Sequence, residues 1–303
     1  MEKNKIIIGS RSSKLALIYS HKVKDEILKY FKGEIEIKKI NTTGDNKLDV
    51  RLSELGGKGL FSKNIEIELL NKNIDLAVHA LKDLPSFETE GLITNCFLKR
   101  NSSNEVLISN ANKSLNELVP GSIIGTSSYR REFQLKKIRK DLNFKLIRGN
   151  IDTRLKKLKN GEYDAIVLSK AGLTSLNLDN EITYEFSNKE LIPSAGQGTI
   201  AIQCREDDRQ MIKFLEKINH EETSITVKSE REVLKVLEGN CETAVGAISK
   251  IQNNKISIKG ELFSLDGNKR YYHEVNCDLK DAYLGGNEVG QKLKEKSKGD
   301  YKK

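Results

Sequence analysis

Short apolar runs alternate with helical patterns of apolar residues over the first eighty residues. The pattern predicts strands at Lys5–Ile8, Ile35–Ile40 and Ile74–Ala80, and helices at Ala16–Tyr30 and Phe61–Leu70. Ser12 or Ser13 can cap the first of these helices. The β-α-β-α-β order favours a mostly parallel sheet with helices on its faces.

A second unit of the same kind follows the polar stretch Lys99–Asn104, which we interpret as a linker. Its predicted elements are a strand at Ser122–Gly125, a helix at Tyr129–Lys140, a strand at Phe144–Ile147, a helix at Ile151–Leu158 and a strand at Tyr163–Leu168. The linker is the first point at which the chain crosses between the two units. Proline and glycine residues near Ile192–Gly198 indicate a second crossing there. The run Ile200–Cys204 is then expected to return to the first sheet as a strand.

The last hundred residues change character. Glu222–Leu237 has a helical pattern, and three alternating runs predict an antiparallel meander at Ala244–Ile251, Ile256–Phe263 and Tyr271–Val275. The charged tail Gln291–Lys303 is expected to fray. The sequence therefore predicts two α/β lobes, residues 1–99 with 200–217 and residues 100–199, followed by a small α+β domain with an antiparallel sheet at 218–303.

The composition narrows the class of protein. No apolar run approaches the roughly 18 residues that cross a bilayer, and the start MEKNKIIIGSR lacks the apolar region of a signal peptide. We therefore expect a cytoplasmic protein without a membrane partner. The cysteines Cys96, Cys204, Cys241 and Cys277 lie far apart and form no CxxC pair, which argues against a metal site.

Basic charge is concentrated in one segment of the chain. The net charge is +9, from 52 basic and 43 acidic residues. Between Arg130 and Lys159 there are twelve basic and three acidic residues, so this segment carries a surplus equal to that of the whole chain. The pattern indicates an anionic partner, either a nucleic acid or a small polyanion.

Cationic and hydroxyl side chains follow the predicted strands, at the edge where α/β sheets bind ligands. They are Arg11, Ser13, Lys82, Thr126, Ser127, Ser128, Arg130, Arg131, Arg148 and Arg154. An arginine at a helix N-terminus opposes the helix dipole unless an anion is bound, and a guanidinium matches a carboxylate in bidentate geometry. The set favours a small, carboxylate-rich ligand over a solvated surface.

One acid, Asp83, stands among these cations. It follows a predicted buried strand and precedes Pro85. It could cap a helix or pair with Lys82, or it could stabilise a cationic intermediate and handle protons. His79 could act as a base, although a lone histidine at a strand end is more often structural. Gly56–Phe61 lacks the spacing of a phosphate-binding loop, and its glycines suggest a mobile loop.

Seven strings, in this order, resemble the porphobilinogen deaminase family, also called hydroxymethylbilane synthases. They are Ser10–Leu17, Gly56–Phe61, His79–Pro85, Gly125–Arg131, Arg148–Leu155, Ala195–Gly198 and Leu237–Cys241. The resemblance implies two lobes like those of periplasmic binding proteins and a third, small α+β domain. It also implies a transferase of heme biosynthesis that joins four porphobilinogen molecules head to tail, releasing ammonia with each, to form hydroxymethylbilane.

The resemblance also implies roles for individual residues. A dipyrromethane cofactor, attached covalently to Cys241, would prime the growing chain, and Asp83 matches the family's catalytic aspartate. Cofactor contacts are expected from Ser13, Lys82, Asp83, Thr126, Ser127, Ser128, Arg130, Arg131 and Arg148. Substrate contacts are expected from Arg11, Lys58, Arg148, Arg154 and Gln197. No metal is implied, and nothing in the sequence demands more than a monomer.

Several positions depart from the family's pattern. Lys14 stands where proline is usual, and Ser103-Asn104-Glu105 replaces a frequent Pro-Arg-Asp. The stretch 171–175 lacks a basic residue often found there, so one carboxylate contact is either missing or supplied elsewhere. Glu242 and the stretch 244–246 replace a commoner Gln and Pro-Ile-Gly. None of these changes falls on Asp83, Cys241 or the main arginines.

Two other functions would explain parts of the pattern. A non-catalytic, two-lobed anion-binding protein would share the basic loops, but the missing export signal and the contexts of Asp83 and Cys241 argue against it. A nucleic-acid-binding protein would share the basic segment. However, aromatic residues make up only 6% of the chain, tryptophan is absent, and the basic residues form no stacking platform.

Overall fold

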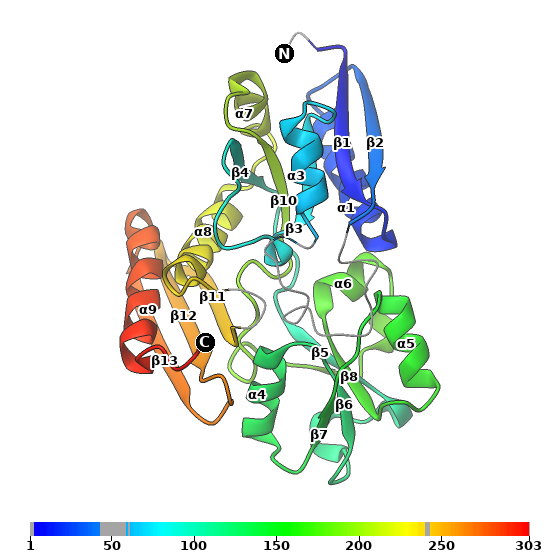
Figure 1. Ribbon diagram of the computed structural model, residues 1–303, viewed down its shortest axis with the longest axis vertical. Coiled ribbons are helices and arrows are strands. Elements are labelled where there is room, and N and C mark those ends of the chain that lie inside the picture. Colours follow the sequence, from blue (N-terminus) through cyan, green and yellow to red (C-terminus); the bar gives the residue numbers. More distant parts are fainter. Residues whose placement is uncertain (1–2, 43–58, 60, 240–242, 303) are drawn as a thin grey trace. The chain divides into compact units, whose positions relative to one another are not determined.

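The computed structural model describes residues 3–42, 59, 61–239 and 243–302 (Figure 1). The chain divides into two compact units. Unit 1 comprises Met1–Lys47, Gly57–Asn101 and Thr199–Ser224, and unit 2 comprises Leu48–Gly56, Ser102–Gly198 and Ile225–Lys303. Among the described residues, the chain thus enters unit 2 after Asn101, which we call the first crossing, and returns to unit 1 after Gly198, the second crossing. It enters unit 2 again after Ser224.

Unit 1 is built on a mixed five-stranded sheet with the order β2-β1-β3-β10-β4. Its strands are β1 (Lys5–Arg11), β2 (Glu34–Ile40), β3 (Leu76–Ala80), β4 (Leu92–Phe97) and β10 (Ile200–Arg205). β1 is parallel to β2 and β3, whereas β10 is antiparallel to β3 and β4. The return of 200–205 to this sheet agrees with the prediction from sequence.

Helices cover both faces of the unit 1 sheet (Figure 1). They are α1 (Lys14–Leu28), α3 (Lys63–Leu70) and α7 (Arg209–Leu215). Ile6 and Ile8 of β1 join the core under α1 and α7, whereas Ile7 packs with the core under α3. Successive side chains of a strand point to opposite faces, so a strand covered on both sides needs an uninterrupted apolar run.

The first sheet of unit 2 repeats this plan with the order β7-β6-β8-β5-β9. Its strands are β5 (Glu105–Ser109), β6 (Ile123–Gly125), β7 (Asn143–Lys145), β8 (Ala165–Ser169) and β9 (Tyr184–Glu185). The helices are α4 (Tyr129–Ile138), α5 (Ile151–Lys159) and α6 (Lys170–Ser175). β6 is parallel to β7 and β8, and β5 is antiparallel to β8 and β9. In each sheet, therefore, the first strand after a crossing enters antiparallel.

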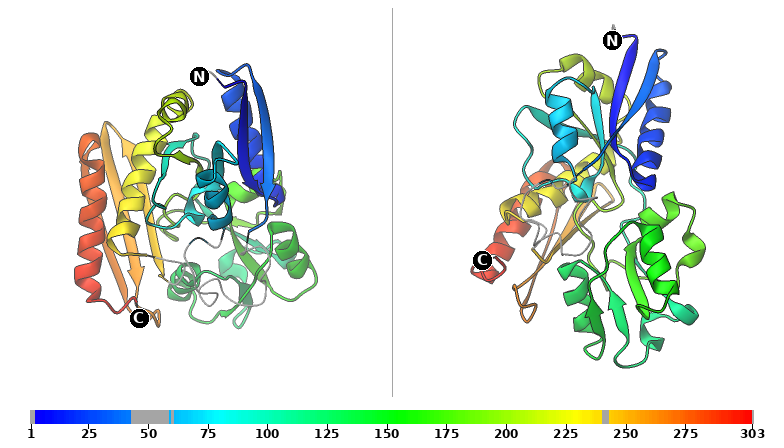
Figure 2. Two further views of the ribbon diagram at one scale, coloured as in Figure 1. Left: turned by 45° about the horizontal axis from the view of Figure 1, so that its top comes forward. Right: turned by 45° about the vertical axis from the view of Figure 1, so that its right-hand side comes forward.

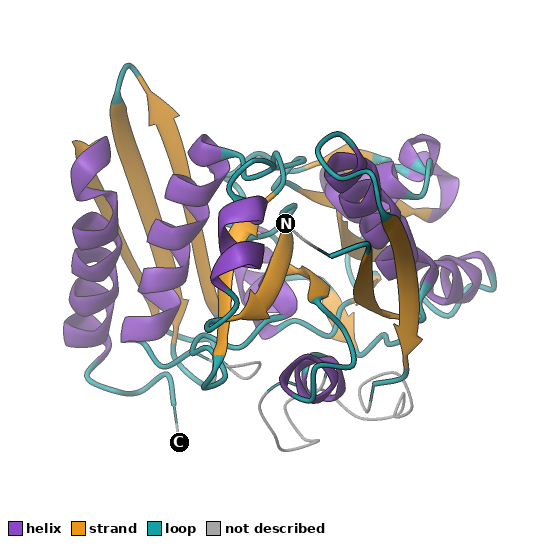
Figure 3. Ribbon diagram, turned by 90° about the horizontal axis from the view of Figure 1, so that it is seen from above, coloured by secondary structure: helices purple, strands orange, loops and turns teal. Residues whose placement is uncertain are grey.

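A three-stranded antiparallel sheet follows in unit 2 (Figures 2 and 3). Its strands are β11 (Val245–Gln252), β12 (Lys255–Phe263) and β13 (Arg270–Asp278), and its helices are α8 (Glu221–Val236) and α9 (Ala282–Ser297). The two helices lie side by side, so close that a Cβ on Gly286 would lie 2.2 Å from the carbonyl oxygen of Ser229. Short 3₁₀ turns lie at Leu81–Asp83, Asn110–Asn112, Leu115–Glu117, Asp179–Glu181 and Leu279–Asp281.

The structure confirms the α/β fold with its antiparallel C-terminal sheet and corrects one detail. The part of the tail that the structure describes, residues 291–302, is not frayed: it contains the second half of α9, where Leu293 is fully buried. Tyr301 is 1% exposed and its hydroxyl donates to the carbonyl of Leu237 at 3.2 Å. In each lobe sheet the strands of the β-α-β-α-β run are parallel, as predicted, and one strand, β10 or β5, runs against the others. The predicted three-domain boundaries stay predictions.

None of the described helices is both long enough and apolar enough to cross a membrane.

Candidate active site

A pocket in unit 1 gathers several of the predicted site residues. Arg11, Ser13, Phe61, His79 and Asp83 are among the side chains that line it. Arg11 is the last residue of β1, and Asp83 ends the 3₁₀ turn that follows β3. Because β1 and β3 are parallel neighbours, their carboxyl ends bring Arg11 and Asp83 to the same edge of the sheet.

Asp83 presents an accessible carboxylate to this pocket. Its side chain is 36% exposed, and its Oδ2 lies 3.9 Å from Nη1 of Arg11, at the outer limit of an ion pair. The Arg11 guanidinium stacks on the ring of Phe61, 4.2 Å from its centroid. The aromatic face orients Arg11 beside Asp83, and the carboxylate stays accessible to a ligand.

Backbone contacts hold the turn that carries Lys82 and Asp83. The N–H of Leu81 donates to the carbonyl of Thr199 at 3.0 Å, and the N–H of Leu84 donates to the carbonyl of Leu81 at 3.1 Å. Leu81 and Leu84 are buried, whereas Lys82 is half-buried and Asp83 exposed. The two leucines anchor the turn in the core and leave the ionisable side chains between them at the surface.

Ser13 is the N-cap of α1. Its Oγ accepts a hydrogen bond from the N–H of Ala16 at 3.3 Å, as expected for a serine at this position. The hydroxyl hydrogen is not used by that bond. Capping is therefore compatible with the predicted cofactor contact, because the same hydroxyl can donate to an anion.

His79 lines the pocket from β3 and is buried. Burial, and to a smaller extent the charge of Arg11, lowers the pKa of His79 to about 4, against an opposing hydrogen-bond contribution from Gln203. The imidazole is therefore neutral at pH 7 and too weakly basic to serve efficiently as a general base there. This favours the structural interpretation of His79 left open by the sequence.

The lowered pKa of His79 predicts a pH-dependent stability. The unfolded chain binds this proton below about pH 6.5 and the folded chain only below about pH 4, so the stabilisation is present above pH 6.5 and lost as the pH falls towards 4. Urea unfolding should show a loss of about 2 kcal/mol between pH 7 and pH 5 that His79→Gln removes. His21→Gln, at an exposed histidine, is the control. Equal pH slopes for the unsubstituted chain and His79→Gln would refute the assignment.

In unit 2, the loop Thr126–Ser128 leads into α4. Ser128 is the N-cap, and its Oγ accepts from the N–H of Arg131 at 3.4 Å. The Oγ1 of the buried Thr126 accepts from the N–H of Ser128 at 3.2 Å. Ser127 and Ser128 remain half-buried. The loop thus presents hydroxyl groups at the N-terminus of a ten-residue helix, where the dipole favours anions.

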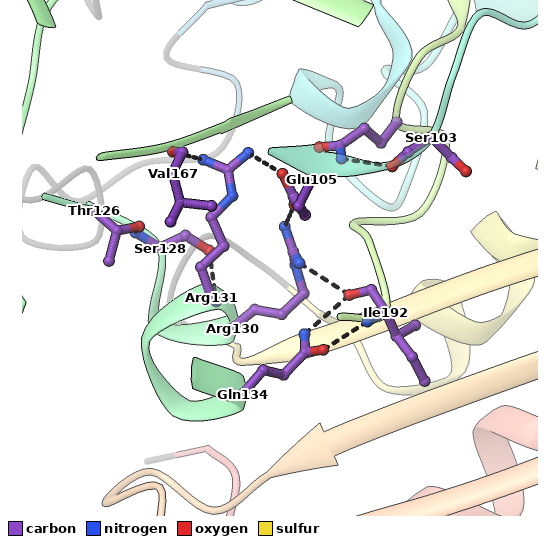
Figure 4. A network of polar contacts seen from close by, with 10 residues as sticks. Ser103, Glu105, Thr126, Ser128, Arg130, Arg131, Gln134, Val167 and Ile192 are labelled. Atoms are coloured by element: carbon purple, nitrogen blue, oxygen red, sulfur yellow. Dashed lines mark hydrogen bonds and ion pairs between the residues drawn. The ribbon is translucent and has the colours of Figure 1, made fainter. Parts of the chain in front are cut away.

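The side chains of Arg130 and Arg131, predicted to contact the cofactor, bind groups inside the protein. Both are buried and converge on the carboxylate of Glu105 (Figure 4). Nη2 of Arg130 donates to one Glu105 oxygen at 2.5 Å, and Nη2 of Arg131 donates to the other at 2.7 Å. Nη1 of Arg131 donates to the carbonyl of Val167 at 3.0 Å. Much of the donor capacity predicted for a cofactor is therefore directed at the protein itself.

Arg148 and Arg154 flank the N-terminus of α5. Arg148 is 5% exposed, and Nε of the half-buried Arg154 donates to the carbonyl of Gly149 at 2.8 Å. Gly149 has φ +108°, a conformation that favours glycine, and a Cβ there would lie 2.9 Å from Thr153. The glycine allows the chain to turn directly from β7 into α5 with an arginine on either side.

Gln197, predicted to contact substrate, is fully buried in the second crossing. Its Nε2 donates to the carbonyl of Ser103 in the first crossing at 2.8 Å. The amide nitrogen of Gln197 is thus used in a hydrogen bond to the protein backbone. Two further predicted site residues, Lys58 for the substrate and Cys241 for the cofactor, lie outside the described residues.

Sequence reasoning missed Glu105 and Gln134 as members of the buried cluster around Arg130 and Arg131. Glu105 was noted as a departure in the family pattern, without a partner. A usable signal was present: an acid opens a strand of apolar residues, Val106–Ile108, and an acid at such a buried position needs a cation. Gln134 carried no comparable signal.

Two family models match the chain. The model described as "Porphobilinogen deaminase, dipyromethane cofactor binding domain" matches residues 6–213, and that described as "Porphobilinogen deaminase, C-terminal domain" matches residues 224–295. The porphobilinogen deaminase of Bacillus cereus is 47% identical over 269 residues, which are 87% of this chain and 86% of that protein. That of Geobacillus kaustophilus is 43% identical over 272 residues, which are 89% and 88%.

Among solved structures, a likeness is found to proteins of low sequence identity. The methionine-binding protein MetQ is 14% identical with a TM-score of 0.46, covering 73% of this chain and 92% of that one. A YaeC-family lipoprotein from Enterococcus faecalis is 12% identical with a TM-score of 0.43, covering 73% and 93%.

Proposed function

The chain belongs to the porphobilinogen deaminase family, and on that premise we propose that it condenses four porphobilinogen molecules head to tail, releasing ammonia, to form hydroxymethylbilane. The observation that carries the proposal is Asp83: an accessible carboxylate beside Arg11, in a pocket at the carboxyl ends of two parallel strands. A transferase of this kind needs an acid that stabilises positive charge next to a cation that binds the substrate's carboxylates.

The residues fit a dipyrromethane cofactor, whose family domain covers residues 6–213. Among the described residues, Nε of the buried Arg131 has no hydrogen-bond partner, and Ser127 and Ser128 offer hydroxyl donors nearby in the chain. Such donors suit the carboxylates of a pyrrole ligand. When bound, the cofactor supplies the pyrrole carbon to which the first substrate ring is joined.

We assign the chain's residues to three tasks. Asp83 hydrogen-bonds pyrrole N–H groups and stabilises the cation that forms when porphobilinogen loses ammonia. Cofactor carboxylates are held by Ser13, Lys82, Thr126, Ser127, Ser128, Arg130, Arg131 and Arg148, and Cys241 carries the covalent attachment. Substrate is held by Arg11, Lys58, Arg148, Arg154 and Gln197. In unit 2, Arg130 and Gln197 are the weakest of the assigned contacts, because their side chains are buried and donate to Ile192, Glu105 and Ser103 of the protein itself.

We further propose that the enzyme works as a cytoplasmic monomer in heme biosynthesis, without a nucleic-acid or membrane partner. Three arginines of the basic segment, at 130, 131 and 148, are buried, so these three do not add to a surface that could follow a phosphate backbone.

Turnover of purified protein tests the proposal directly. We expect porphobilinogen to be consumed with release of one ammonia per molecule and formation of hydroxymethylbilane, measured by ammonia assay and by the absorbance of the oxidised product. Binding of porphobilinogen without ammonia release would instead identify a non-catalytic anion-binding protein. Protein produced in cells that make porphobilinogen should be used, so that the cofactor can be assembled.

A further inference from the structure

A cluster of polar side chains is buried in unit 2 around the first two turns of α4 (Figure 4). Glu105 is 0% exposed and Gln134 is 2% exposed, and neither has a role in the assignments above. Burying a carboxylate and an amide is costly unless both are fully hydrogen-bonded. Their partners therefore indicate what the cluster does.

Gln134 binds the backbone of Ile192 in both directions. Its Nε2 donates to the carbonyl of Ile192 at 2.9 Å, and its Oε1 accepts from the N–H of Ile192 at 2.6 Å. Nη1 of Arg130 donates to the same carbonyl at 2.9 Å. Ile192 precedes the return of the chain to unit 1 after Gly198. Two side chains of α4 are thus hydrogen-bonded to the segment that leads into the second crossing.

Glu105 connects the same helix to the first crossing. It opens β5, shortly after the chain enters unit 2 at Ser102, and its carboxylate accepts from both Arg130 and Arg131. The two crossing segments also touch directly, through the bond from Gln197 to Ser103. The two crossing segments therefore contact each other, and both are hydrogen-bonded to side chains in the first two turns of α4.

The charges make this connection sensitive to substitution. Burial lowers the pKa of Arg130, and the nearby charge of Glu105 opposes that shift. One carboxylate accepts hydrogen bonds from two buried guanidinium groups, so its removal takes the paired charge from both and leaves Glu261 as the other acid whose charge acts on Arg130. Without the carboxylate, Arg130 and Arg131 would no longer hold the start of β5 by hydrogen bonds to residue 105.

We propose that Glu105 and Gln134 are positioning residues that hold both crossing segments on α4 and so fix the ligand loop Thr126–Ser128 at the N-terminus of that helix. The inference rests on the proposed function, because that loop is the part of α4 assigned to the ligand's carboxylates. A change at the cluster is transmitted to the loop through a single short helix, whose first turn carries Arg130 and Arg131.

Two substitutions test the proposal against matched controls. Glu105→Gln removes the charge at nearly constant shape, and Gln134→Met removes both bonds to Ile192 without altering charge. Glu162→Gln and Gln252→Met, at exposed positions of the same unit, are the controls. Amide hydrogen exchange should be faster by about ten- to a hundredfold in the segments 102–105 and 190–197, the factor expected for the loss of one strong hydrogen bond. Below the melting temperature, KM for porphobilinogen should rise by about tenfold, with a smaller change in kcat.

Glu105→Asp provides the rescue, because it keeps the carboxylate: its KM should lie between those of the unsubstituted chain and Glu105→Gln. Unchanged exchange in both crossing segments would overturn the proposal, and so would faster exchange with unchanged KM, which would show a purely structural role. If Glu105→Gln does not fold, Gln134→Met decides on the same two readouts. Absence of turnover in the unsubstituted chain would count against the proposed function instead, and exchange would still decide whether the two side chains hold the crossings.

Discussion

Replacing Asp83 with asparagine is expected to lower kcat by a factor of about 10²–10⁴, the range associated with loss of a catalytic acid–base or charge-stabilising group. Asparagine has nearly the same shape and can still accept a hydrogen bond, but it carries no charge to stabilise the cation left by ammonia. The measurement is steady-state release of ammonia from porphobilinogen.

The position of Asp83 makes this a clean experiment. Its side chain is 36% exposed and its ion pair with Arg11 is long, at 3.9 Å, so the pair contributes at most about 1 kcal/mol to folding. The variant should therefore have an almost unchanged melting temperature and keep its cofactor, as shown by intact mass. Asp207→Asn, at an exposed aspartate of the same unit, should behave like the unsubstituted chain. Turnover at the unsubstituted rate in Asp83→Asn would reject the catalytic assignment.

The sequence was sufficient to predict the pocket around Asp83 because its residues follow from local rules. Arg11 and Asp83 come at the ends of apolar runs, and parallel neighbouring strands bring their carboxyl ends to one edge. The inference requires only that the two strands run in the same direction in one sheet, and the alternation of strands and helices predicts this. The same holds for Ser13 and Ser128, whose capping roles are visible in the few residues that follow them.

The cluster around Glu105 could not be predicted in the same way. Arg130 looked like a ligand contact because its partner lies 25 positions earlier in the chain and a second partner, Ile192, lies 62 positions later. Such pairings depend on β5 entering the sheet antiparallel beside β8, and that order is a property of the whole fold. The C-terminal helix was missed for a related reason. Glycines such as Gly286 let it approach α8 closely, and because glycine has no Cβ it leaves gaps in the apolar pattern of the helix.

Replacing Cys241 with serine is expected to abolish both cofactor attachment and turnover. The unsubstituted chain, purified from cells that make porphobilinogen, should be heavier than its sequence by two pyrrole units, and Cys241→Ser should have the mass of the sequence alone. A serine hydroxyl is a far weaker nucleophile than a thiolate, so attachment should not occur at an observable rate. Intact-mass spectrometry and ammonia release measure the two effects on one sample.

The three cysteines that the structure describes support the choice of Cys241. Burial raises the pKa of Cys96 and of Cys204 to about 12, and burial likewise raises the pKa of Cys277. A thiol reacts as its thiolate, so these three are poorly suited to attachment. Cys277→Ser is the most stringent control, because Cys277 is the least buried of them and should keep the mass increment when replaced. An increment that persists in Cys241→Ser, or that is lost in Cys277→Ser, would place the attachment elsewhere in the chain.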